Sequence, residues 1–146
     1  MSGPTDPAEA HFDKGLWGFD GSEWQKLGLI WGYYDRWGED LGATKSGDGT
    51  YNAITTAVPA GYVYVLQGIS LVNISGARGM MRFYAEVGVP YYTVAVSVTP
   101  AQYVPLVFVG NGVLKAGDSV VVNQLSCLNG DVLYGGVWGY KMKLSM

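Results

Sequence analysis

Three acidic residues, Asp35, Glu39 and Asp40, lie close together in the sequence and could perform acid-base chemistry. Two carboxylates that lie about 5 to 9.5 Å apart suffice to cleave a glycosidic bond. The segment therefore raises the hypothesis of a glycoside-active enzyme that uses these three acids. The same residues fit a solvated acidic loop, and we favour that interpretation.

The remaining reactive side chains are few. The chain has one histidine, His11, which precedes every predicted strand, and one cysteine, Cys127, which follows one. A Ser-His-Asp triad needs a rigidly held imidazole, and a cysteine nucleophile needs a histidine nearby. One cysteine and one histidine also exclude an internal disulfide and a His/Cys metal cluster within one chain. We therefore expect no catalytic residue, no metal and no cofactor.

Aromatic side chains are the more prominent feature, with 5 Trp and 11 Tyr in 146 residues. Exposed tryptophan and tyrosine stack on sugar rings, and the same residue types are enriched where proteins contact each other. We expect most of the rings to lie in the core or at a subunit interface, with carbohydrate stacking as the alternative. The candidates for an interface or for ligand stacking are Trp17, Trp24, Trp31, Tyr33, Tyr34, Trp37, Trp138 and Tyr140.

The composition favours β-structure in a single domain. Charged residues make up only 14% of the chain, whereas glycine is abundant at 22 residues, which disfavours both disorder and helical bundles. Lysine and arginine are scattered singly, so the sequence offers no basic patch for nucleic acid. It also has no apolar run of membrane-spanning length and no signal-peptide pattern. We expect a protein made in the cytoplasm, with neither nucleic acid nor membrane as partner.

The leading part of the chain differs from the rest. Residues 1–14 have no apolar period and are predicted to form an extended N-terminal arm. Residues 15–48 are predicted to form an aromatic hairpin followed by an acidic loop segment. The hairpin would turn at Asp20-Gly21, a type I′ signal that sets Trp17 opposite Trp24. Residues 29–41 combine rings at a spacing of three with two glycines, and we predict an irregular or extended segment there.

Residues 49–146 form the body, a series of short strands separated by Gly, Pro or Asn-Gly. Regular spacing without helical periodicity predicts an all-β fold, an antiparallel β-sandwich or jelly roll of about eight strands, within one globular domain over residues 15–146. A turn is expected at Pro59-Ala60-Gly61. The strands are predicted at residues 50–58, 62–74, 80–87, 91–99, 103–109, 119–126 and 132–144.

Two stretches resemble known families. Residues 114–122, LKAGDSVVV, followed by residues 136–140, GVWGY, resemble the last strands of trimeric jelly-roll domains of the complement C1q and tumour-necrosis-factor type. Residues 12–27, FDKGLWGFDGSEWQKL, look like the Trp-Asp-Gly-Ser/Thr-x-Trp-x-Lys-Leu phrase of small structural proteins of tailed bacteriophages. Phe19 stands where that phrase often has a second tryptophan.

Together the resemblances imply a non-enzymatic virion protein, such as a capsid decoration protein or a tail-associated protein, with a jelly-roll body. Expected partners are further copies of the chain, as a trimer, and a major capsid protein or tail components. In such families an arm often reaches onto a neighbouring subunit, which the resemblance implies for residues 1–14. The alternative is a receptor-binding or carbohydrate-binding module that uses exposed aromatic residues, with a glycan as ligand.

Overall fold

The computed structural model describes residues 17–19, 24–26, 34–86 and 91–144. Side chains are described for residues 35–86 and 92–144. The described residues form strands and no helix. In chain order the strands are β1 (Trp17–Phe19), β2 (Trp24–Lys26), β3 (Tyr34–Asp40), β4 (Ala43–Thr44), β5 (Gly49–Ile54), β6 (Tyr62–Asn73), β7 (Met81–Glu86), β8 (Tyr91–Ser97), β9 (Leu106–Leu114), β10 (Ser119–Cys127) and β11 (Val132–Lys143).

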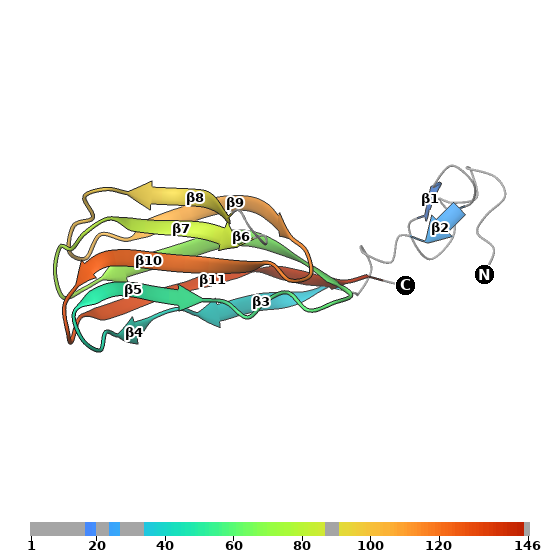
Figure 1. The fold of residues 1–146 in the computed structure, drawn as a ribbon. Coiled ribbons are helices and arrows are strands. Elements are labelled where there is room, and N and C mark those ends of the chain that lie inside the picture. Colours follow the sequence, from blue (N-terminus) through green and yellow to red (C-terminus); the bar gives the residue numbers. More distant parts are fainter. Residues whose placement is uncertain (1–16, 20–23, 27–33, 87–90, 145–146) are drawn as a thin grey trace.

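Strands β3 to β11 form two antiparallel sheets that lie face to face (Figure 1). Sheet I has the order β3-β11-β6-β9, with β4 also paired to β11, and sheet II has the order β5-β10-β7-β8. Without the short strand β4, the sandwich has eight strands. The first of these, β3, pairs with the last, β11, and the second, β5, pairs with the seventh, β10. This is the strand order of a jelly roll. The predicted all-β sandwich of jelly-roll type is confirmed.

The sandwich begins earlier in the chain than the sequence indicated. Tyr34–Asp40 is a regular strand, paired with β11 from Tyr34 opposite Met142 to Asp40 opposite Gly136. Of the two predicted alternatives, irregular or extended, the extended one is confirmed over these residues, where Trp37 points into the core and Gly38 takes an exposed position. The expected boundary at residue 49 thus falls inside the sandwich.

The leading hairpin exists, but its register differs from the prediction. In the β1–β2 pair Phe19 lies opposite Trp24, and Trp17 lies opposite Lys26. The predicted pairing of Trp17 with Trp24 is wrong, because Phe19 is the partner of Trp24 and the register is shifted by two residues. A register shift of two residues leaves each residue on the same face of the hairpin. Trp17, Phe19 and Trp24 therefore still occupy positions on one face.

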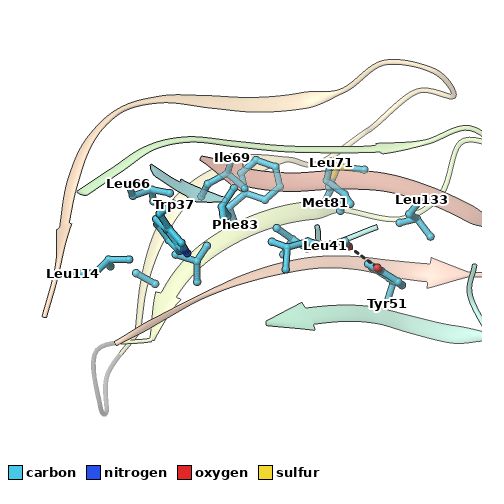
Figure 2. Packing of buried hydrophobic residues seen from close by; sticks show 14 of the residues in the cluster. Trp37, Leu41, Tyr51, Leu66, Ile69, Leu71, Met81, Phe83, Leu114 and Leu133 are labelled. Atoms are coloured by element: carbon cyan, nitrogen blue, oxygen red, sulfur yellow. Dashed lines mark hydrogen bonds between the residues drawn. The ribbon is translucent and has the colours of Figure 1, made fainter. Parts of the chain in front are cut away.

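The core lies between the two sheets (Figure 2). Sheet I contributes Ile69 and Leu71, and sheet II contributes Phe83, each with no exposed surface. Tyr51 enters from β5, where its hydroxyl donates a hydrogen bond of 2.6 Å to the Leu41 carbonyl. Burial raises the pKa of this phenol, with a further contribution from Asp40.

Two turns match their sequence signals. Gly61 has a φ of 81° at the predicted Pro59-Ala60-Gly61 turn. Gly117 has a φ of 91° between β9 and β10, where the Asp118 carboxylate accepts a hydrogen bond of 2.9 Å from the Lys115 amide. Both positions need a conformation that glycine adopts without steric cost.

A buried polar cluster links the loops beyond β6 and β10. Arg78 donates two hydrogen bonds of 2.7 Å to the Asp131 carboxylate, which also accepts one of 2.9 Å from the Leu128 amide. Asn73 donates to Asp131 at 3.3 Å and to Gln124 at 3.1 Å. Hydrogen bonding from Arg78 holds the pKa of Asp131 well below its usual range. The cluster fixes the loops while leaving only 2% of Asp131 exposed.

Candidate interaction surface

The structure gives each of the three acids considered for catalysis a separate structural partner. The Glu39 carboxylate accepts hydrogen bonds from the Trp37 indole at 3.1 Å and from the Thr56 amide at 2.9 Å. Asp35 lies 3.8 Å from the Lys141 ammonium, and Asp40 accepts from the Gly42 amide at 2.8 Å. Strand alternation places Asp40 on the face of β3 opposite to Asp35 and Glu39.

The described part of the chain brings few metal-ligating or nucleophilic groups together. It contains no group of three or more His, Cys, Asp or Glu side chains that could hold a metal ion. Nor does it contain a helix long and apolar enough to cross a membrane. Cys127 is fully buried, and burial raises the pKa of its thiol.

The aromatic candidates fall into different environments. Trp37 is only 6% exposed and packs against Tyr64, with ring centroids 5.0 Å apart, so its assignment to an interface or ligand site is wrong. Trp138 is 42% exposed, and Tyr140 lies on the same strand two residues further on. The backbone of Tyr34 lies in β3. Trp17 and Trp24 lie in the hairpin strands, whereas Trp31 and Tyr33 fall outside the described residues.

The outer face of sheet I is the most unusual surface of the described sandwich. We call the part that β11, β6 and β9 contribute the uncharged face, because none of its outward positions holds a charged residue. The only charged residues at outward positions of sheet I are Arg36 and Asp40, on the edge strand β3. The outward positions of the uncharged face are Val63, Val65, Gln67, Gly68, Ser70, Val72, Val107, Val109, Asn111, Val113, Val132, Tyr134, Gly136, Trp138, Tyr140 and Met142.

Several apolar side chains of this face are open to solvent. Val109 is 75% exposed, Val113 is 70% exposed and Tyr134 is 59% exposed. The register places Val109 and Trp138 on either side of Gly68, in one row across three strands. Single exposed apolar residues are ordinary, but a contiguous apolar patch marks an interaction site.

Trp138 lies against the sheet and does not project from it. A Cβ atom at position 68 would overlap the six-membered ring of the indole, so the ring covers the Gly68 backbone. β6 carries a bulge at this point, between the pairs Gly68–Trp138 and Leu66–Gly139. Only a residue without a side chain leaves room for the indole to lie flat, with its other side exposed.

The sequence interpretation missed the valines of this face. It predicted a strand at residues 103–109, which ended before Gly110-Asn111-Gly112, whereas β9 runs from Leu106 to Leu114. The available signal was the absence of any charged residue from position 87 to position 114. Val107, Val109 and Val113 alternate along an edge strand. This pattern could have indicated a sheet face that carries valines where charged residues are usual.

Comparisons with known proteins found similarity at the level of three-dimensional structure. No family model and no curated protein match the sequence. One similar solved structure is a protein of Bacillus endospore appendages, described as disulfide-linked pili, with 16% identity and a TM-score of 0.43. The match covers 77% of this chain and 88% of that chain. Another is a CBM4 structure, with 13% identity, a TM-score of 0.31 and coverage of 74% and 89%. These values do not assign the chain to a family.

Proposed function

We propose that the protein is a non-enzymatic structural subunit that associates with further copies of itself through the uncharged face. The observation that carries the proposal is the exposure of Val109, Val113, Tyr134 and Trp138 on a sheet face without charge. Interface cores are depleted of charged residues and enriched in aromatic ones. When a second protein surface covers such a face, apolar area is removed from water, and this burial stabilises the complex.

The more specific proposal is a trimeric component of a bacteriophage virion, such as a capsid decoration protein that binds the capsid lattice. It is supported by the resemblance of residues 12–27 to phage structural proteins and of residues 114–122 to trimeric jelly rolls. Binding of the purified protein to phage heads that lack it, measured by co-sedimentation, tests this part. Failure to bind heads or tails would leave self-association standing and remove the virion assignment.

Sedimentation velocity of the full chain tests self-association. We expect the wild type to form a defined oligomer and Val109→Lys to sediment as a monomer, because assembly would bury the lysine charge. The matched control is Thr93→Lys, which places the same charge on β8 of sheet II. A wild type that stays monomeric at all concentrations, or a Val109→Lys variant that remains oligomeric, would contradict the proposal.

Carbohydrate binding is the second candidate, and the flat exposed indole of Trp138 favours it. Aromatic rings of β11 at positions 134, 138 and 140 share the outward face with the polar side chains of Gln67, Ser70 and Asn111. Sugar rings stack on such surfaces and take hydrogen bonds from polar neighbours. Titration of the protein with glycans should then quench tryptophan fluorescence in the wild type and not in Trp138→Ala. A flat response across a glycan array would count against this function.

A further inference from the structure

Tyr103 has a backbone conformation that its side chain does not favour. It lies in the loop between β8 and β9, residues 98–105, and its φ is 62°. This left-handed region suits glycine, whereas a bulky residue there is uncommon and costs conformational energy. The Tyr103 amide donates a hydrogen bond of 3.1 Å to the carbonyl of Asn73, the last residue of β6. The Gln102 side chain donates one of 2.8 Å to the Ile74 carbonyl. These two bonds fasten the loop to the sandwich and hold the unfavourable conformation.

The fold gains little from the Tyr103 side chain. The residue is 67% exposed, and no described residue gives its ring a stacking partner or its hydroxyl a hydrogen bond. Glycine would meet the backbone requirement at lower cost. Residues held in such sparsely populated conformations cluster at active sites and ligand clamps. The exposed ring at a strained position therefore indicates a ligand contact.

The same loop forms most of a small cavity, whose volume is about 140 Å³. Pockets for drug-sized ligands measure roughly 300–1,000 Å³, whereas an apolar cavity of about 150 Å³ takes one benzene ring. The cavity therefore has room for one six-membered ring. Its lining includes Ser97, Thr99, Pro100, Val104, Pro105 and Leu106.

The lining of the cavity limits the chemistry of its ligand. None of the lining residues carries a charge, so an ionised ligand would lose hydration without gaining an opposite charge. Ser97 and Thr99 bring hydroxyl groups that can donate and accept hydrogen bonds, and the prolines bring apolar surface. A sugar ring has apolar C–H faces and a rim of hydroxyl groups, and it uses both kinds of surface. An aromatic side chain of a protein partner would use only the apolar one.

We propose that the loop at residues 98–105 binds one uncharged sugar ring of a glycan, which stacks on Tyr103 and enters the neighbouring cavity. Ala101 and Val104, on either side of Tyr103 in the chain, both line that cavity. The site shares no residue with the uncharged face, so it goes beyond the proposed self-association. It also does not involve Trp138, and glycan binding here is independent of the second candidate function.

Titration of the full chain with simple sugars, followed by saturation-transfer NMR, tests the site. The probes are the methyl glycosides of glucose, galactose, mannose and N-acetylglucosamine, with that of glucuronic acid as the charged counterpart. We expect at least one neutral glycoside to bind and the glucuronide to bind more weakly. Tyr103→Gly should weaken binding by about fivefold or more, because the stacking surface is lost, whereas Tyr103→Phe should retain it. Thr99→Val, which removes only a hydroxyl group from the lining, should also weaken binding. The matched control is Tyr134→Ala, which removes a similarly exposed ring (59%) from β11 and should bind like the wild type.

Thermal unfolding of the same variants separates a ligand contact from a structural role. Tyr103→Gly removes the steric cost of the left-handed conformation, so its midpoint should equal or exceed that of the wild type while binding falls. A clearly lower midpoint would show that the ring stabilises the fold and would overturn the inference. Failure of every neutral glycoside to bind, or unchanged binding by Tyr103→Gly, would overturn it too. Binding that is lost in Trp138→Ala and kept in Tyr103→Gly would overturn this site and leave the second candidate function standing. The oligomeric state of Tyr103→Gly should match the wild type, so failure of the glycan site leaves the proposed self-association intact.

Discussion

The indole of Trp138 occupies the space that a side chain at position 68 would need. Trp138 and Gly68 are direct partners across β11 and β6, at the bulge of β6. The glycine thus fixes the orientation of the ring, and the ring shields the β6 backbone. This pair forms the centre of the uncharged face.

Gly68→Ala should therefore displace the ring. Overpacking of this kind typically costs about 1–3 kcal/mol, and the free energy of unfolding should fall by that order in urea titrations. The shifted ring should also change the near-ultraviolet circular dichroism. In a Trp138→Ala background the same substitution should cost little, because the clash is gone. Equal costs in the two backgrounds would show that Gly68 is needed for another reason.

Trp37 should behave as a core residue and not as a ligand residue. Trp37→Ala removes a large side chain that is 6% exposed, so we expect a loss of about 3–5 kcal/mol in the free energy of unfolding. Trp37→Phe keeps a ring beside Tyr64 but loses the hydrogen bond to Glu39, and it should cost less. A Trp37→Ala variant as stable as the wild type would contradict the burial described above.

Strand positions were largely predictable because turn residues mark the ends of the strands. The turns at Gly61 and Gly117 and the limits of β6, β7, β10 and β11 follow from glycine conformation and alternation. β3 was predicted only as an irregular or extended segment, because Trp31, Tyr34 and Trp37 recur at a helical spacing and the partner strand β11 lies about a hundred residues away. Long-range pairing of this kind outweighs local propensity.

Asp131 should make the fold sensitive to acid. Its folded pKa is lowered, chiefly by hydrogen bonds from Arg78. The stabilisation is therefore complete above the unfolded value of about 3.9 and is lost as the pH falls through the folded value. Urea titrations between pH 7 and pH 2.5 should show a decline in stability below about pH 4 that Asp131→Asn lacks.

At neutral pH Asp131→Asn should cost on the order of 3 kcal/mol, because it breaks a buried ion pair. Arg78→Lys is the matched control, since it keeps the charge but loses the two-bond geometry. It should reduce the acid dependence without abolishing it. An unchanged acid profile in Asp131→Asn would mean that other carboxylates dominate.

Cys127 should be inert in the folded protein. It is fully buried and its thiol donates to the Gln124 side chain at 3.5 Å, and burial raises its pKa. A chromogenic disulfide reagent should fail to label the native wild type and should label it once urea unfolds the chain. Asn111→Cys, an exposed thiol on β9, should react at once under native conditions. Rapid labelling of native Cys127 would show that the loops beyond β10 open locally.

The surface properties were harder to predict than the strands. Sequence alone could not distinguish the buried Trp37 from the exposed Trp138, since both stand beside a glycine on a strand. Val109 follows the regular alternation of β9, but its place in one row with Trp138 depends on the register shift of β6 beside Gly68 against both neighbours. A bulge depends on contacts between strands, and its position is therefore not readable from one strand alone.

Tyr34 and Met142 lie opposite each other, so the first and last strands of the sandwich meet at one tip. The two ends of the domain therefore differ. A contact between this tip of one copy and the outer face of sheet I of another copy joins two different surfaces. Repetition of such a contact rotates each copy by a constant angle relative to the one before it. A rotation of one third of a turn without translation closes a three-membered ring, whereas a rotation combined with translation generates a helical fibre that can grow without limit.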